Sequence, residues 1–197
     1  MMADSLRTPS FDQAALYAAV LIGLFALVGV PFWAAGAGLP EPAVLTSTAV
    51  LAAGLITLSI IDVRTYRLPD WLTLPLLACG LAATWHIGAS DWQWHVAAAL
   101  AGYLVLRLIA EAYRLYRGFE GLGLGDAKLL AAGGAWLGIS ALPTVLLWAC
   151  LLAAGQILLS RRQTGGIDAS TPLPFGPALS LGIWLVWLYG PVGGLSQ

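Results

Sequence analysis

The chain has 197 residues, of which 59 % are hydrophobic and only 10 % are charged, and its net charge is −1. Soluble domains carry about 25 % charged residues, so this composition excludes an ordinary soluble domain and predicts an outer surface that faces lipid. The near-zero net charge produces no field that would indicate a nucleic-acid partner.

The length fits one domain, and apolar segments are spread evenly along it. We therefore predict a single membrane-embedded domain over residues 1–197. Cys79 and Cys150 both fall inside apolar segments, where we expect them to pack as small apolar side chains. Two lone thiols do not form a zinc site or a disulfide framework, and we predict no metal and no cofactor.

Seven apolar segments follow one another, and most approach the roughly 20 residues that cross a bilayer. We expect them at 14–37, 43–61, 71–88, 92–111, 127–142, 143–160 and 175–190. Turn-forming stretches such as GLPEP at 38–42 separate them. The predicted fold class is all-α, a polytopic integral membrane protein with about seven transmembrane helices. Whether the shortest segment, 127–142, fully crosses the membrane is left open.

The first segment has some features of a cleavable signal peptide, since it ends in the small residues AAGAG. However, Asp4, Arg7 and Asp12 precede it without a net positive charge. The segment is also longer than the usual apolar core of about 7–15 residues. We therefore expect a retained transmembrane helix.

The positive charges all fall on one side of this topology. If the amino terminus is inside, the inner regions and inner helix ends hold all nine Lys and Arg residues, which are Arg7, Arg64, Arg67, Arg107, Arg114, Arg117, Lys128, Arg161 and Arg162. The outer connections hold none. By the positive-inside rule, the amino terminus is predicted to be cytoplasmic and the carboxyl terminus to lie outside.

Two acids stand at the predicted cytoplasmic ends of apolar segments. Asp62 ends the second segment in LSIID, and Asp126 opens the fifth in GLGLGD. An acid at the rim of a membrane span is costly to desolvate and needs a partner or a purpose. Two carboxyl groups that approach each other do not both ionise readily, so an ionised member can take a proton from water while a protonated member donates one. Two simpler roles stay open: Asp126 as a helix cap, and Asp62 as a solvated residue paired with Arg64.

Three glycines, Gly121, Gly123 and Gly125, alternate immediately before Asp126. Glycine lets a backbone bend sharply and approach another chain closely. We therefore expect Gly123 and Gly125 to shape a loop that presents Asp126 to a substrate.

Three stretches resemble the bacterial type IV prepilin peptidases, a GxGD family of membrane aspartic proteases. FEGLGLGDAKLLAAGGAWLG at 119–138 is similar to the family's GxGD signature, and IDVRTYRLPDWLTLPLLACGL at 61–81 is similar to its first catalytic segment. LPFGPALSLGIW at 173–184 resembles the PFGP motif that opens its last helix. The resemblance implies a multi-pass aspartic endopeptidase of the inner membrane with its site facing the cytoplasm. The family's two catalytic aspartates map onto Asp62 and Asp126.

Two further polar residues lie close to these stretches. Lys128 follows Asp126 near the helix start, where it would tune the ionisation of the acids, bind a lipid phosphate, or serve as an ordinary inner-side cation. Asp70, in PDWLT, is expected to be the N-cap of the third segment and is a second-rank candidate for the site.

The remaining polar residues are not assigned to chemistry. Glu111 is expected to be solvated or paired with Arg114 or Arg117. His86 and His95 lie near the predicted outer face, far from the two acids, and are not expected to bind a metal.

The chain departs from the resembled family in one respect. Many members carry an amino-terminal extension with paired CxxC motifs and also methylate the new amino terminus of the pilin. This chain has no CxxC. It therefore resembles the catalytic half alone, a short form for which zinc is not implied and methylation is left open.

The functional prediction is cleavage of the basic leader from type IV prepilins or type II secretion pseudopilins, after a glycine and before the hydrophobic segment. The expected partners are these membrane-inserted substrates and the lipid bilayer. One alternative is a related peptidase of Flp/Tad-type pilins or archaeal preflagellins. An alternative from a different functional class is a proton- or ion-coupled carrier. A carrier would place its acids near the bilayer midplane, whereas Asp62 and Asp126 both lie at the rim of their predicted spans. The particular pilin and the oligomeric state are left open.

Overall fold

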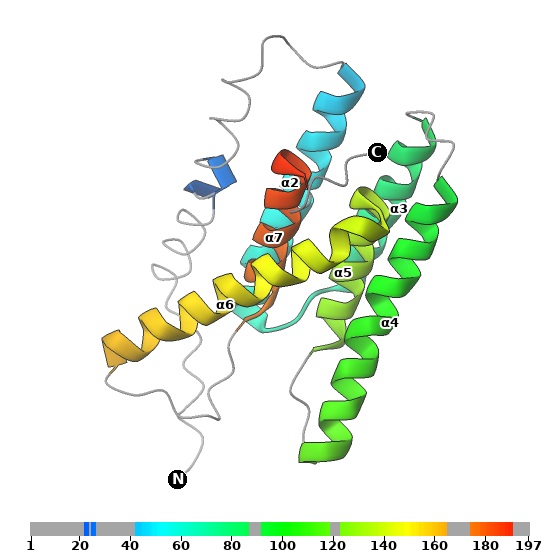
Figure 1. Ribbon diagram of the computed structural model, residues 1–197. Helices are drawn as coiled ribbons and strands as arrows, with labels where there is room; N and C mark the ends of the chain where they lie inside the picture. Colours follow the sequence, from blue (N-terminus) through cyan, green and yellow to red (C-terminus); the bar gives the residue numbers. More distant parts are fainter. Residues whose placement is uncertain are drawn as a thin grey trace.

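The computed structural model describes residues 22–23, 25–26, 42–86, 92–118, 123–164 and 174–190 (Figure 1). The helices are α2 (Pro42–Thr65), α3 (Asp70–His86), α4 (Trp92–Arg117), α5 (Leu124–Leu137), the short 3-10 helix η1 (Ile139–Ala141), α6 (Leu142–Thr164) and α7 (Gly176–Tyr189). The described part of the chain contains no strand. The all-α fold class is confirmed for these residues.

The expected segments from 43–61 onward each correspond to a helix, with ends that differ by up to six residues. The expected segment 127–142 is not one continuous helix: α5 ends at Leu137, Gly138 takes a φ of 80°, and the chain continues into η1 and α6. The expected segment 14–37 lies almost wholly outside the described residues.

Among the described residues, three helical stretches are long and apolar enough to cross a membrane: Pro42–Thr65, Trp92–Arg117 and Ile139–Leu158. Gly176–Tyr189 is a shorter apolar helix. With 14 residues each, α5 and α7 extend over about 21 Å, less than the roughly 30 Å of a hydrocarbon core. Membrane spans are therefore supported, whereas seven spans and the orientation remain predictions.

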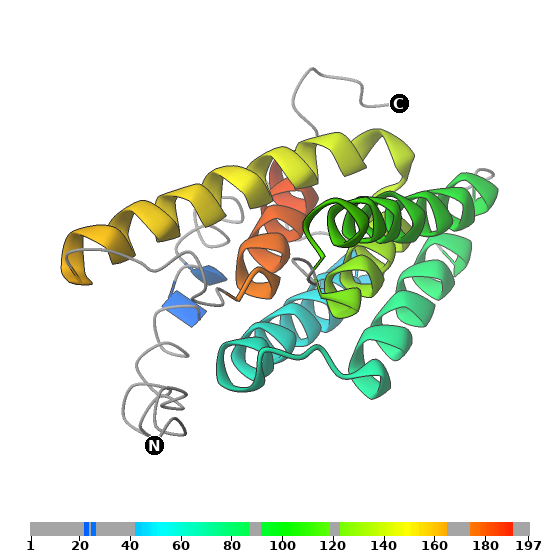
Figure 2. The same cartoon turned by 90° about the horizontal axis from the view of Figure 1, so that it is seen from below.

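Helix α5 occupies the centre of the bundle, packed against α4, α3 and α7 (Figures 1 and 2). Helix α2 packs against α7 and α3, and α6 crosses α7 obliquely. Ten residues of α5 are buried, and they come from all sides of the helix. A helix that is apolar all round is typical of a core position, which explains how so short a helix is held.

Small residues bring α4 and α5 into close contact. A Cβ added at Gly134 would lie 2.6 Å from the carbonyl oxygen of Ala98, and one at Gly102 would lie 2.9 Å from that of Leu130. Only glycine allows two helix backbones to approach this closely, which is a common way of packing helices in membranes.

Tryptophan side chains connect the core helices through hydrogen bonds to backbone groups. The indole N–H of Trp136 in α5 donates to the carbonyl of Leu76 in α3, at 2.9 Å. The indole N–H of Trp184 in α7 donates to the carbonyl of Phe25 at 3.2 Å, and the two rings lie 5.5 Å apart. Buried tryptophans satisfied in this way combine a large apolar contact with a fixed orientation.

The outer faces of the long helices are apolar. Exposed large side chains on α4 and α6 include Leu100, Leu104, Leu108, Leu147, Leu151 and Leu158. Cys79 and Cys150, which were expected to pack as small apolar side chains, are also exposed and do not lie in the core. Sequence hydropathy does not distinguish a core position from one that faces lipid, because both are apolar.

Candidate active site

Asp62 lies in the last turn of α2 and is 5 % exposed. Its Oδ2 accepts a hydrogen bond of 3.0 Å from the backbone N–H of Gly176, the first residue of α7. The alternative left open for Asp62, a solvated residue paired with Arg64, is therefore wrong. The acid of α2 instead binds the amino-terminal end of α7, where unpaired N–H groups favour a negative charge.

The contact requires the glycine of the PFGP stretch. A Cβ at Gly176 would lie 2.6 Å from Oδ2 of Asp62 and 2.9 Å from its carboxyl carbon. Phe175, the N-cap residue, provides no side-chain hydrogen bond, and a proline occupies the first turn of α7. Sequence reasoning had not assigned Gly176 a role, although the Gly-Pro pair at a helix start was a usable signal.

Asp126 lies in the first turn of α5 and is 8 % exposed. The N-cap is Gly123, and the backbone N–H of Asp126 donates to the Gly123 carbonyl at 3.2 Å. Asp126 is thus not itself the cap. Its helix starts at the same end of the bundle as the last turn of α2 (Figure 1). The two acids therefore lie at one end of the bundle, although their helices are far apart in the sequence.

The loop glycines differ in their structural roles. Gly123 has φ −71° and ψ 139°, an extended conformation open to other residues, so the expected special backbone bend is absent there. Gly125 makes a close contact: a Cβ would lie 2.7 Å from Cβ of Leu68 and 3.3 Å from its backbone nitrogen. Leu68, in the connection before α3, had not been assigned to the site. Gly121 lies outside the described residues.

The two acids interact electrostatically. Asp126 precedes the apolar part of α5 and lies outside the helices long enough to cross a membrane. Burial, and secondly the nearby charge of Asp62, raise the pKa of Asp126 to about 7, against the opposing effect of a hydrogen bond with the Gly123 backbone. A carboxyl group with such a pKa retains its proton below neutral pH and is suited to donating it.

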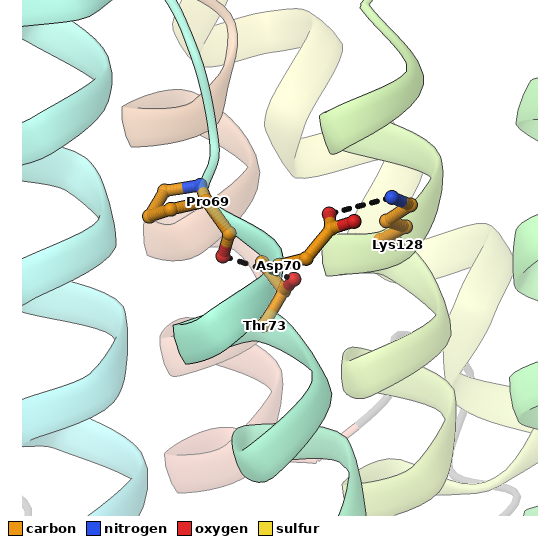
Figure 3. Close-up of polar contacts among 4 residues, drawn as sticks. All are labelled: Pro69, Asp70, Thr73 and Lys128. Atoms are coloured by element: carbon orange, nitrogen blue, oxygen red, sulfur yellow. Dashed lines mark hydrogen bonds and ion pairs between the residues drawn. The ribbon is translucent and has the colours of Figure 1, made fainter.

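Asp70 and Lys128 form an ion pair beside this site, with 2.5 Å between Oδ1 and Nζ (Figure 3). Asp70 is the first residue of α3, and the carbonyl of Pro69 accepts the N–H groups of Leu72 and Thr73. The expected N-cap role of Asp70 is therefore wrong. The pair joins α3 to α5, and Lys128 lies two residues after Asp126. Because the Asp70 side chain is 57 % exposed, the pair contributes about 0–1 kcal/mol to the stability of the fold.

Two further polar residues, Glu111 and His95, have partners in the described structure. Glu111 forms an ion pair of 2.5 Å with Arg114, which is one of its two expected partners. His95 lies within hydrogen-bond distance of the Ala135 carbonyl, at 3.1 Å. No group of three His, Cys, Asp or Glu residues that could hold a metal occurs among the described residues.

The chain is similar to known proteins over most of its length. A family model described as the type IV leader peptidase family matches residues 49–158, which include Asp62 and Asp126. A protein of Burkholderia pseudomallei is 46 % identical over 132 residues (67 % of this chain, 42 % of the relative), and one of Aeromonas hydrophila is 46 % identical over 140 residues (69 % and 47 %). One of Dickeya chrysanthemi is 42 % identical over 172 residues (87 % and 60 %).

These three relatives are each named prepilin leader peptidase/N-methyltransferase. The chain spans about half the length of the curated relatives it matches first. No solved structure matches.

Proposed function

Because the chain belongs to the type IV leader peptidase family, we propose that it is a membrane aspartic endopeptidase in which Asp62 and Asp126 activate water. The observation that carries this proposal is the burial of two acids in turns of separate helices at one end of the bundle (Figure 1). A protein interior hosts such a pair at a cost in stability, because neighbouring carboxyl groups resist ionisation. Catalysis that needs one protonated and one ionised member accounts for that cost.

The proposed division of roles follows from the surroundings of each acid. Asp62, which accepts the N–H of Gly176 at the start of α7, is the ionised base, since that position favours a negative charge. Asp126, with its pKa raised to about 7, is the protonated acid.

In the first step Asp62 takes a proton from water, the water oxygen bonds to the peptide carbonyl carbon, and Asp126 gives its proton to the carbonyl oxygen. In the second step Asp62 returns its proton to the leaving nitrogen and Asp126 recovers one from a hydroxyl of the intermediate as the C–N bond breaks. The peptide and one water become a carboxylic acid and an amine, and both aspartates return to their starting states.

The proposed substrate is a prepilin or pseudopilin whose short basic leader precedes an apolar helix. Support comes from the names of the relatives, which refer to prepilin leaders, and from the acidic character of the site, which complements a basic leader. The apolar outer faces of the helices allow a substrate helix to approach through the membrane.

A proton- or ion-coupled carrier is disfavoured by the positions of the acids. Asp62 is in the last turn of its helix and Asp126 in the first turn of its own, whereas carriers place their charged sites near mid-membrane.

The proposed location is the inner membrane, with seven spans, a cytoplasmic amino terminus and the acids facing the cytoplasm. Support comes from the one-sided distribution of Lys and Arg. In a variant with Cys79 and Cys150 replaced by alanine, single cysteines at Thr65 and Ser90 test it. The label at Ser90 should react with an impermeant reagent in intact cells and the label at Thr65 only after lysis; the opposite pattern would invert the proposed orientation.

The catalytic proposal is tested with purified protein in lipid vesicles and four synthetic substrates: a prepilin, a type II pseudopilin, a Flp-type pilin and a preflagellin, each with its leader and apolar segment. Asp62→Asn and Asp126→Asn should each lose cleavage while retaining wild-type thermal stability or better. Near-native turnover by either variant would refute the two-acid mechanism. Cleavage of the Flp-type or preflagellin substrate alone would move the chain to that branch.

A further inference from the structure

In the contact between α2 and α7, a backbone N–H of one helix holds the proposed catalytic carboxylate of the other. Gly176 donates its N–H to Oδ2 of Asp62 at 3.0 Å, with both groups buried. The bond is long-range, 114 residues apart in the sequence. It therefore depends on how α7 docks against α2 and not on local chain geometry.

The space around this bond admits no side chain at position 176. A Cβ there would meet three atoms of Asp62: Oδ2 at 2.6 Å, the carboxyl carbon at 2.9 Å and Cβ at 3.2 Å. Two of these atoms belong to the carboxyl group itself, so relief requires that the carboxylate rotate or that the two helices separate. Either movement displaces the group that takes the proton from water.

The amino-terminal end of α7 has few other ways to satisfy Gly176. Phe175 makes no side-chain capping bond and its own backbone is helical, with φ −85° and ψ −25°. An unpaired buried N–H is costly, so Asp62 and Gly176 each satisfy the other.

From these contacts we propose that Gly176 is a positioning residue for the cleavage reaction. Its N–H holds Oδ2 of Asp62 and thereby presents the other carboxylate oxygen to the attacking water. The inference rests on the proposed function, because it assumes that Asp62 is the base. A competing explanation, in which Asp62 serves only to cap α7, predicts an effect on stability alone.

The first test compares Gly176→Ala with two matched glycine-to-alanine controls. At Gly155 an added Cβ has nothing within 4 Å, and at Gly54, on the same helix as Asp62, it meets Leu76 Cδ1 at 2.7 Å. Because a displacement of about 1 Å costs on the order of 100-fold in rate, Gly176→Ala should lower kcat by about that factor.

The split between kcat and KM separates positioning from a general loss of packing. A group needed only in the transition state lowers kcat and kcat/KM together, so KM should change by less than about threefold. Gly155→Ala and Gly54→Ala should keep kcat, whichever way the contact with Leu76 changes the thermal midpoint of Gly54→Ala. Wild-type kcat in Gly176→Ala, or an equal loss in Gly54→Ala, would overturn the proposal.

The second test does not depend on activity and also covers a variant that folds poorly. Thermal midpoints in detergent are measured for Asp62→Ala, Gly176→Ala and the double variant. Since the carboxyl group is what the new Cβ meets, Gly176→Ala should cost much less stability, or recover its folding, when Asp62 is alanine. The same loss on both backgrounds would contradict the contact.

The two tests also separate this inference from the proposed function. An active Asp62→Asn protein would refute the two-acid mechanism, while the stability cycle would still report on the bond between α2 and α7.

Discussion

Replacing Gly125 by alanine is expected to slow peptide cleavage by on the order of 100-fold. The added Cβ would lie 2.7 Å from Cβ of Leu68, whereas nonbonded carbons settle at about 3.5–4.0 Å. The overlap is thus about 1 Å. Leu68 cannot relieve it by rotating its side chain, because Cβ and the backbone nitrogen at 3.3 Å move only with the chain. The first turn of α5 must shift instead, and it carries Asp126.

Gly123→Ala is the matched control for Gly125→Ala. Its backbone is extended, with φ −71°, and an added Cβ meets Oδ2 of Asp126 at 3.4 Å, an ordinary contact. Alanine at 123 should therefore retain cleavage within about threefold of wild type, since no backbone strain is introduced.

The assay is the initial rate of cleavage of a prepilin peptide by protein reconstituted in vesicles, normalised to the amount of folded protein. The thermal midpoint should fall as well, by the equivalent of about 1–3 kcal/mol for an overpacked contact. Full activity in Gly125→Ala, or an equal loss in Gly123→Ala, would show that the close approach to Leu68 does not control the position of Asp126.

The remaining predictions concern pH, the ion pair and the helix packing. With Asp126 as the proton donor and its pKa raised to about 7, kcat/KM should fall as the pH rises through about 7; a flat profile to pH 9 would exclude this role. The same shift means that the folded chain keeps a proton that the unfolded chain releases between pH 3.8 and about 7, so stability attributable to Asp126 should fall as pH rises through that window, and Asp126→Asn should remove the slope. Asp70→Asn and Lys128→Ala should each retain measurable cleavage and cost no more than about 1 kcal/mol, because the Asp70 side chain of the pair is more than half exposed; a folded but inactive Asp70→Asn protein would instead place Asp70 in the chemistry. Gly134→Ala should lower stability by about 1–3 kcal/mol in detergent unfolding, since its Cβ would lie 2.6 Å from a backbone carbonyl of α4; an unchanged midpoint would contradict the close contact of α4 and α5.

The helices themselves were largely predictable from the sequence. Segment 92–111 corresponds to α4 and segment 175–190 to α7, because apolar length and turn-forming residues are local properties. The break at Gly138 was missed, since the apolar run 129–142 contains no charge or proline to mark it. The 3-10 turn there follows from packing, and the sequence carries only a glycine as its signal.

The two acids were also identifiable, but the sequence alone determined only that they lie on the same side. Charge distribution assigns Asp62 and Asp126 to one end of the helices, and their burial and mutual influence depend on where α2 and α5 stand in the bundle. For the same reason the sequence did not distinguish the role of Gly123 from that of Gly125. Gly125 is needed because of Leu68, a neighbour that no local pattern reveals.

The partners of the charged groups were decided by the tertiary structure alone. Asp70 has the sequence context of an N-cap, yet its carboxylate pairs with Lys128, 58 residues away. Asp62 has Arg64 as a neighbour in sequence, yet it binds the backbone of Gly176 across the bundle. A hydrogen bond to a backbone N–H leaves no trace in residue type, because every residue except proline has that group. The sequence does indicate the space that the bond to Asp62 requires, because a glycine, Gly176, stands at the first position of α7.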